Sequence, residues 1–235
     1  ANTAIPTISA IILAGAKPKL VDISSDYLIN VNHIKKSITS KTKAIIPVHL
    51  YGQACDMEKI CKIAKKYKLK VIEDCAQAQG AKFKNKYVGS FGDAGCFSFY
   101  PTKILGGYGD GGFVSTSSIN LYQKVRRIRF YGIERNNKKN RFNNKYYANE
   151  HGTNSRISEI QLSILNLKLP RVNSLINQRR KLAKLYSQEL QNTSLKLPIE
   201  NINCKHVFHL YVVYHPKRDK IIRKLKANNI QVNIN

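Results

Sequence analysis

The chain has 235 residues, 43% of them hydrophobic, which is enough to bury a substantial core. Its formal net charge of +26 comes from 40 lysines and arginines spread along the whole length; this argues against nucleic-acid binding but favours acidic substrates such as nucleotide diphosphates. No apolar run of about 18 residues predicts a membrane span, and five cysteines without a CxxC pair exclude a zinc or disulfide framework and favour the cytoplasm.

The first third of the chain alternates between predicted strands and helices. We expect, in order, a helix ended by Gly15, a strand over Lys19–Ile23, a helix over His33–Ile38 capped by Asn32, a strand over Lys43–Leu50, an amphipathic helix capped by Asp56, and a strand over Leu69–Glu73. This alternation is typical of right-handed crossover units in a largely parallel sheet. Ligands of such sheets bind beyond the carboxyl ends of the strands, where Asp74 stands.

The remainder of the chain predicts two more strands and several helices. We expect strands over Cys96–Tyr100 and Gly112–Thr116, a helix over Ile119–Phe130, a long loop over 131–153, a helical stretch over Arg156–Leu190 broken at Pro170, a polar linker over Gln191–Lys205, a strand over Val207–Tyr214, and a helix over Asp219–Ala227. The last strand and helix cannot bury their apolar faces alone, so they predict the start of a second domain that is cut off.

The chemically informative residues lie mainly between Val71 and Gly112. Asp74 follows an apolar strand, Ser98 lies in a predicted strand, and Lys103 precedes a glycine-rich loop. Each has an ordinary explanation when taken alone: the aspartate caps a helix, the serine faces solvent, and the lysine is one basic residue among many. His49 and Tyr51 follow another strand end, where they either line a pocket or pack in the core.

The combination of these motifs resembles the DegT/DnrJ/StrS-type sugar aminotransferases, which are pyridoxal 5'-phosphate enzymes. The segments that carry the resemblance, in the family's order, are AKPKLVDI, KTKAIIPVHLYGQ, VIEDCAQAQGA, VGSFGDAGCFSFYPTK, GDGG and NSRISEIQ. The resemblance implies an α/β fold of three layers around a mostly parallel central sheet, known as fold type I. Residues 1–168 would form the large cofactor-binding domain without its N-terminal part, 169–205 the linking helix and linker, and 206–235 the start of a smaller, truncated α+β domain.

The resemblance also implies a role for each site residue. Lys103 would bind the cofactor aldehyde covalently and then transfer protons, because a partly desolvated lysine has a lowered pKa and a free amine. Asp74 would pair with the pyridine nitrogen, Gln77 would lie near the ring hydroxyl, and Ser98 would bind the phosphate. Asn154 would reach the cofactor of a neighbouring subunit, which implies a homodimer with shared active sites. No metal ligand set is expected.

The implied reaction is transfer of an amino group to a keto-deoxysugar linked to a nucleotide diphosphate, with glutamate as the expected donor. Within the resemblance, Tyr100 and Asp110 are similar to the residues of members that act at the 3-keto position, and the 4-keto position stays an alternative. Relatives that are dehydratases carry histidine in place of the lysine, so Lys103 argues against that branch. A truncated, inactive or regulatory member of the family is the other alternative.

Overall fold

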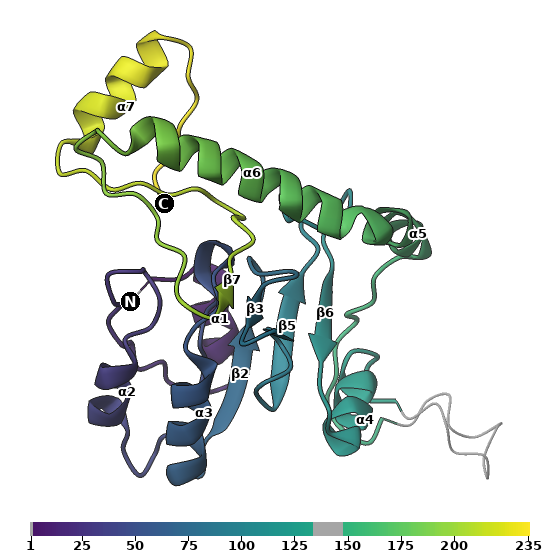
Figure 1. The fold of residues 1–235 in the computed structure, drawn as a ribbon. Coiled ribbons are helices and arrows are strands. Elements are labelled where there is room, and N and C mark those ends of the chain that lie inside the picture. Colours follow the sequence, from purple (N-terminus) through teal and green to yellow (C-terminus); the bar gives the residue numbers. More distant parts are fainter. Residues whose placement is uncertain (1, 134–147) are drawn as a thin grey trace.

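The computed structural model describes residues 2–133 and 148–235, and a four-stranded sheet lies at its centre (Figure 1). Its strands, in the order β1-β2-β5-β6, are β1 (Ala44–Ile45), β2 (Lys70–Asp74), β5 (Ala94–Ser98) and β6 (Gly112–Ser115). β1, β2 and β5 run parallel, and β6 pairs antiparallel with β5. The predicted α/β class with a mostly parallel sheet is therefore confirmed.

Helices surround this sheet. They are α1 (Ile5–Leu13), α2 (Val31–Ser37), α3 (Met57–Lys66), α4 (Ile119–Ile128), α5 (Glu159–Lys168), α6 (Val172–Leu190) and α7 (Arg218–Ala227), with 3-10 turns η1 (Leu50–Gly52) and η3 (Leu169–Arg171). α3 begins as predicted, because the Asp56 side chain accepts a bond from the Lys59 amide. Its buried residues Ile60 and Ile63 turn one apolar stripe toward the core. α3 packs on β2, and α2 packs on α3.

The long helix α6 runs across the end of the sheet at which β5 finishes (Figure 1). Its Ile176 is fully buried in the main core. The predicted break at Pro170 is confirmed, because this residue lies in the 3-10 turn that separates α5 from α6. None of the described helices is long and apolar enough to cross a membrane.

A second, three-stranded sheet brings the C-terminal region back to the first half of the chain. β7 (Cys204–Lys205) pairs antiparallel with β3 (Lys82–Phe83), which also pairs with β4 (Lys86–Tyr87). The sequence patterns did not predict this sheet, because strands of two residues are too short to show any alternation of apolar and polar positions. The domain boundaries at residues 168 and 205 stay predictions.

Two predicted strands are wrong. In Lys19–Ile23 no regular strand forms: Ile23 makes an isolated bridge to Ile29, and the Asp22 carbonyl accepts a 2.9 Å bond from the Asn30 amide. In Val207–Tyr214 the first residues bond to a turn instead of a strand, since the Val207 amide donates to the Gly52 carbonyl over 3.0 Å, and at the far end Tyr214 makes an isolated bridge to Lys196. The positive φ of Phe208, 47°, is incompatible with an extended strand at that point.

Three smaller differences concern element ends. The cap of α2 is Asn30, not Asn32, since the Asn30 side chain accepts a bond from the Asn32 amide. The predicted strand over Lys43–Leu50 is shorter: regular pairing covers only Ala44–Ile45, Val48 adds an isolated bridge to Asp74, and η1 begins at Leu50. The predicted long loop over 131–153 falls mostly outside the described residues.

Candidate active site

Asp74 is the last residue of β2, and its backbone is held by the neighbouring segment. Its amide donates to the Pro47 carbonyl over 2.9 Å, and its carbonyl accepts from the His49 amide over 3.0 Å. Its carboxylate accepts from the Ala76 amide at Oδ1, over 3.1 Å, and from the Thr7 hydroxyl at Oδ2, over 2.7 Å. Two consecutive turns follow Asp74, so the explanation that it merely caps a helix is wrong.

Lys103 lies half-buried in the loop between β5 and β6. Burial lowers the pKa of its amine, and the negative charge of Asp74 acts in the opposite direction without restoring the ordinary value. The lysine and the carboxylate are therefore close enough to interact electrostatically. A lysine with a lowered pKa has more of the neutral amine that attacks a carbonyl carbon.

Gln77 has a fixed orientation on the turn after Asp74. Its Oε1 accepts a 2.7 Å bond from the backbone amide of Tyr51, whose φ is 58°. This contact assigns the oxygen of the side-chain amide, so the other end of the amide is the NH₂ group, a donor. Tyr51 itself is buried against Tyr27, and its hydroxyl accepts a bond from Asn2, so it serves as packing for η1.

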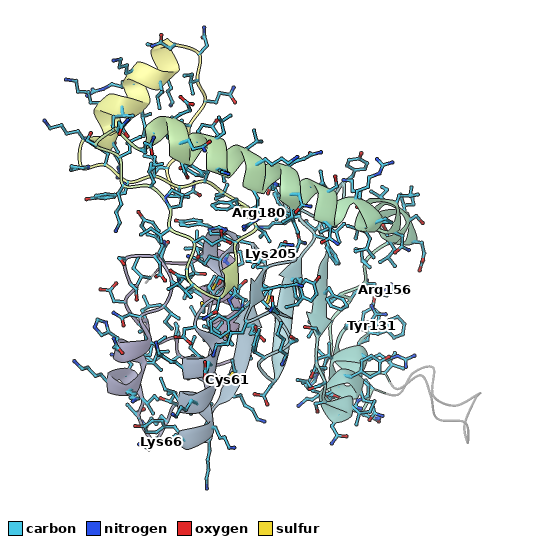
Figure 2. All side chains as sticks on the ribbon, viewed as in Figure 1. Cys61, Lys66, Tyr131, Arg156, Arg180 and Lys205 are labelled. Atoms are coloured by element: carbon cyan, nitrogen blue, oxygen red, sulfur yellow. The ribbon has the colours of Figure 1, made fainter. Side chains whose placement is uncertain are left out.

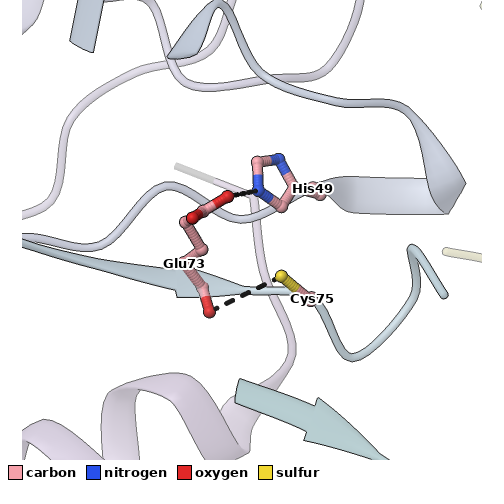
Figure 3. A group of neighbouring side chains, drawn as sticks. All are labelled: His49, Glu73 and Cys75. Atoms are coloured by element: carbon pink, nitrogen blue, oxygen red, sulfur yellow. Dashed lines mark hydrogen bonds and ion pairs between the residues drawn. The ribbon is translucent and has the colours of Figure 1, made fainter. Parts of the chain in front are cut away.

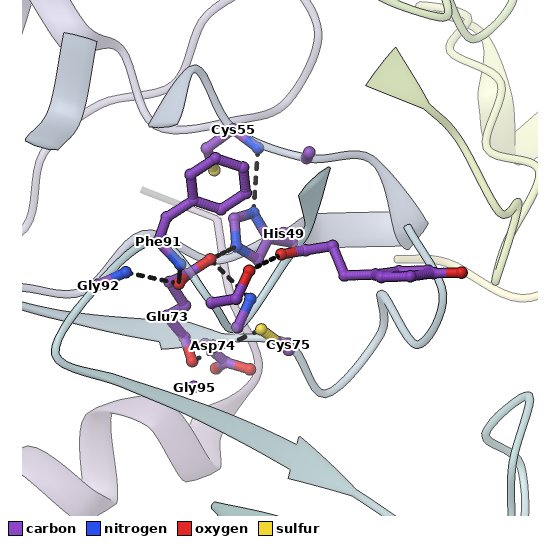
Figure 4. Close-up of polar contacts among 12 residues, drawn as sticks. His49, Cys55, Glu73, Asp74, Cys75, Phe91, Gly92 and Gly95 are labelled. Carbon is purple, nitrogen blue, oxygen red and sulfur yellow. Dashed lines mark hydrogen bonds and ion pairs between the residues drawn. The ribbon is translucent and has the colours of Figure 1, made fainter. Parts of the chain in front are cut away.

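His49 and Glu73, the residue before Asp74, form a fully buried pair (Figure 3). His49 Nε2 lies 3.0 Å from Glu73 Oε2, and His49 Nδ1 accepts a 3.0 Å bond from the Cys55 amide. The Glu73 carboxylate also accepts bonds from the backbone amides of Gly89, Phe91 and Gly92 (Figure 4). Burial alone would raise the pKa of Glu73, but the bonds from His49 and from the amides outweigh it and lower that pKa.

Cys75 completes this buried cluster. The Cys75 sulfur, a ring nitrogen of His49 and a carboxylate oxygen of Glu73 are atoms that could bind a metal ion, and they lie within 4.8 Å of one another. The Cys75 thiol also contacts the Glu73 carbonyl over 3.8 Å (Figure 3). Burial raises the pKa of the Cys75 thiol, which disfavours the thiolate that a metal would require. Because the imidazole and the carboxylate already bond to each other and to backbone amides, the cluster has the contacts of a structural network.

Ser98 ends β5, the strand next to β2. Asp74 pairs with Cys96, so Ser98 lies two residues farther along the neighbouring strand, about 7 Å beyond that pairing. Its hydroxyl oxygen accepts a 3.2 Å bond from the Tyr100 amide, and a hydroxyl that accepts still carries a proton to donate. Two adjacent parallel strands thus end at Asp74 and Ser98. The segments that follow these strand ends carry Gln77 and Lys103.

Asn154 contacts other parts of the chain than the four residues just described. Its backbone forms an isolated bridge with Phe130, and its side-chain oxygen accepts a 2.8 Å bond from Arg156. The residue is exposed, and Arg156 lies beside Tyr131 on the side of the sheet where β6 is the edge strand (Figure 2). The expected role of Asn154 in a neighbouring subunit stays a prediction.

Three residues near the site were not predicted from the sequence: Thr7, Gln79 and His209. Thr7 contacts Asp74, and the Gln79 side chain bonds to the backbone of Ser98. The only sequence signal for Gln79 was its place in the same AQAQ motif as Gln77. Thr7 had none, because it is 67 residues away from its partner.

His209 comes from the C-terminal segment that docks on η1. It is buried, and the Leu210 amide next to it donates to the Tyr51 carbonyl over 3.3 Å. The guanidinium of Arg179 donates to the His209 carbonyl over 3.2 Å. Burial, with the positive charges of Lys103 and Arg179, lowers the pKa of His209 to about 4. His209 is therefore a neutral neighbour of the lysine.

The donor set fits pyridoxal 5'-phosphate. The carboxylate of Asp74 suits a protonated pyridine nitrogen, the oriented NH₂ of Gln77 suits the ring hydroxyl, and the hydroxyl of Ser98 suits a phosphate oxygen. The amine of Lys103 has the lowered pKa that attack on an aldehyde requires.

Comparisons with known proteins identify the family of the chain. The model of the DegT/DnrJ/EryC1/StrS aminotransferase family matches residues 1–235. The chain is 43% identical to the dTDP-3-amino-3,4,6-trideoxy-alpha-D-glucose transaminase of Micromonospora megalomicea subsp. nigra, over 99% of this chain and 62% of that protein. It is 44% identical to the pleiotropic regulatory protein of Geobacillus stearothermophilus, over 98% of this chain and 60% of that protein.

Solved structures give the same result. The crystal structure of S. venezuelae DesV in complex with a ketimine intermediate superposes with a TM-score of 0.91 at 34% identity, over 97% of this chain and 60% of that one. The chain thus spans about three fifths of the length of the relatives that it matches.

Proposed function

The chain belongs to the DegT/DnrJ/EryC1/StrS aminotransferase family, and we propose that it is the cofactor-binding part of a sugar aminotransferase that uses pyridoxal 5'-phosphate. The observation that carries the proposal is the oriented carboxylate of Asp74 together with a half-buried Lys103, whose pKa is lowered by burial and raised in part by the charge of Asp74. When bound, the cofactor supplies an electron sink for the negative charge that develops at the substrate carbon.

Asp74 would hold a proton on the pyridine nitrogen. The Thr7 hydroxyl and the Ala76 amide each bond to one oxygen of its carboxylate, so the carboxylate is oriented before any ligand binds. Such preorganisation avoids a cost of reorganisation when charge develops. Gln77 would donate to the ring hydroxyl and Ser98 to the phosphate.

Lys103 would carry the proton transfers. As a neutral amine it accepts a proton from the substrate carbon on one side of the reaction, and as an ammonium it returns that proton to the next atom. The loop holds it close enough to Asp74 for the two charges to interact. The neutral imidazole of His209 adds no positive charge that would depress the pKa of the lysine further.

The favoured substrate is a 3-keto-6-deoxyhexose linked to a nucleotide diphosphate, with glutamate as the amino donor. The name of the Micromonospora relative specifies a 3-amino sugar, which supports this position. The net charge of +26 would attract a diphosphate by long-range electrostatics. Assays of the full-length protein with 3-keto and 4-keto dTDP-sugars distinguish the two positions, and turnover of the 4-keto sugar alone contradicts the preference.

The second candidate function is regulatory, and the name of the Geobacillus relative is the observation that favours it. A regulatory protein would bind the cofactor or a partner without turnover. Amino transfer from glutamate to the cofactor, followed without any sugar present, separates the two functions, because only the aminotransferase performs this first half-reaction.

We also propose a homodimer in which Asn154 of one subunit completes the site of the other. A mixing experiment tests this arrangement: Lys103→Ala and Asn154→Ala variants, each inactive alone, are unfolded together and refolded. Shared sites predict recovery of activity, since one site of the mixed dimer keeps both native residues. Sites contained within one subunit predict no recovery.

The central test is covalent attachment of pyridoxal 5'-phosphate at Lys103. The full-length protein is incubated with the cofactor, reduced with borohydride, digested and examined by mass spectrometry. We expect the added mass on the Lys103 peptide, its loss in Lys103→Ala, and its retention in the control Lys66→Ala, which removes an exposed lysine of α3. Absence of labelling in the wild type refutes the proposed function.

A further inference from the structure

Gln79 lies on the turn that follows Asp74 and Gln77, and the residue is 7% exposed. Its Nε2 donates to the Ser98 carbonyl over 2.7 Å and to the Leu105 carbonyl over 3.1 Å. Its Oε1 accepts from the Leu105 amide over 2.7 Å. Both hydrogens and the oxygen of the amide are therefore engaged by the backbone of another segment.

That segment is the loop from Ser98 to Leu105, which carries Lys103. Gln79 bonds to both of its ends. Inside the loop the Lys103 amide donates to the Tyr100 carbonyl over 2.9 Å, but no regular helix or strand holds the loop in place. Ile104 anchors the loop in the apolar core, and the Phe99 amide donates to the Gly111 carbonyl over 2.8 Å. Gln79 adds buried polar contacts that join the loop to the turn after β2.

The outer side of the same region is held by α5. Gln161 accepts a 2.8 Å bond from the Tyr108 amide, and Lys168 donates to the Gly106 carbonyl over 2.7 Å. These contacts begin after Leu105, so they hold the glycine-rich segment that follows the loop. They do not tie the lysine to the segment of Asp74, whereas Gln79 does.

We propose that Gln79 is a positioning residue that holds the Lys103 loop at a fixed distance from Asp74. The proposal rests on the proposed function, because it concerns the two residues that would bind opposite ends of the cofactor. Gln79 links them through a short path: it is five residues beyond Asp74 and bonds to both ends of the loop that carries the lysine.

The chemistry of this contact requires a glutamine. Asparagine is one methylene shorter, and methionine has a similar length but no donor. An ionised glutamate keeps an acceptor for the Leu105 amide, loses both donors, and faces two carbonyl oxygens with a negative charge. Gln79→Met therefore removes the three bonds with little change of volume, and Gln79→Glu removes the two donated ones.

The test uses the full-length protein without cofactor first. Competitive acylation over a range of pH, read by mass spectrometry, measures the titration of Lys103, and hydrogen exchange measures protection of the Leu105 amide. In Gln79→Met we expect the Lys103 titration to move to higher pH, since a loosened loop exposes the amine to water, and Leu105 to exchange faster. Gln188→Met, an exposed site on α6, is the control.

The second stage adds pyridoxal 5'-phosphate and both substrates. We expect Gln79→Met to lower kcat by about 100-fold with a smaller change in KM, because misplacement of a reacting group by about 1 Å has this effect. Unchanged Lys103 titration and unchanged Leu105 exchange in a folded Gln79→Met variant overturn the proposal.

Two further outcomes are decisive. If Gln79→Met does not fold, the same measurements on Gln79→Glu decide, and failure of both variants to fold assigns Gln79 to the fold and overturns the proposal. If the wild type never attaches the cofactor at Lys103, the proposed function fails, yet acylation and exchange still show whether Gln79 positions the loop.

Discussion

The hydroxyl of Thr7 donates a 2.7 Å hydrogen bond to the Asp74 carboxylate, joining the first turn of α1 to the end of β2. α1 has no buried residue of its own, so apolar packing does little to hold it in place. A bond to an ionised group contributes more than one between neutral groups. The contact therefore does two things: it anchors α1, and it orients the carboxylate proposed to meet the pyridine nitrogen.

Thr7→Val keeps the shape of the side chain and removes this donor. We expect the free energy of unfolding to fall by about 2 kcal/mol, the usual size for a hydrogen bond to a charged group. Urea denaturation of the full-length protein measures the change. Ser9→Ala, in the same helix, is the control, and an equal effect of the two variants contradicts the anchoring role.

Glu73→Gln removes the buried charge of the residue before Asp74. The carboxylate accepts from His49 and from three backbone amides, and a glutamine would turn an NH₂ group toward at least one of these donors. We expect a loss of about 3 kcal/mol, or failure to fold. The control Glu58→Gln disrupts only the exposed pair with Lys84 and should cost less than about 1 kcal/mol. Similar denaturation midpoints for both variants would contradict the network.

Gly52→Ala tests the docking of the C-terminal segment on η1. Gly52 has a φ of 101°, and an added Cβ would lie 2.7 Å from Val207 Cγ2 and 2.9 Å from the His209 amide nitrogen. Gly15→Ala is a matched control, because its φ is also positive, 73°, but no atom lies within 4 Å.

We expect Gly15→Ala to cost about 1 kcal/mol for its backbone conformation alone. Gly52→Ala should cost at least about 2 kcal/mol more, since backbone atoms must move. Hydrogen exchange at the Val207 and Leu210 amides should accelerate only in Gly52→Ala. Equal exchange in both variants would show that the segment does not depend on this contact.

The buried histidines of the docked segment predict a pH dependence of stability. Burial lowers the pKa of both His206 and His209 from 6.5 to about 4; for His209, Lys103 and Arg179 add to the shift, and for His206 Arg180 adds while Glu200 opposes it. As the pH falls below 6.5, the unfolded chain takes up protons before the folded chain does, so stability decreases until about pH 4.

Each histidine contributes up to about 3 kcal/mol to this decrease. His209→Gln should make the slope of unfolding free energy against pH shallower between these limits, as measured by urea denaturation at a series of pH values. Replacement of the exposed His33 controls for the loss of an imidazole. A slope in His209→Gln as steep as in the wild type would contradict burial of a neutral His209.

Local patterns were enough for much of the fold and for the strand end at which the candidate site lies. Asp56 as a cap and the stripe of Ile60 and Ile63 predicted α3, because both signals lie within one helix. The apolar run before Asp74 predicted a strand that ends at the ligand-binding edge. The strand over Val207–Tyr214 was predicted wrongly because the segment docks on a turn through Val207, which is fully buried, whereas Val213 and Tyr214 at its end are exposed. A run of apolar residues does not show in sequence whether its partner is a strand or a turn.

The sequence by itself determined the α/β class, the strand end at Asp74, and the motif that includes Lys103, since these depend on residues close together along the chain. Only the tertiary structure decided which distant groups meet them. Thr7 reaches Asp74 across 67 residues, and Gln79 reaches Leu105 across 26. Such contacts depend on the pairing of strands and the packing of helices, and a hydrogen bond forms only when both place donor and acceptor about 3 Å apart.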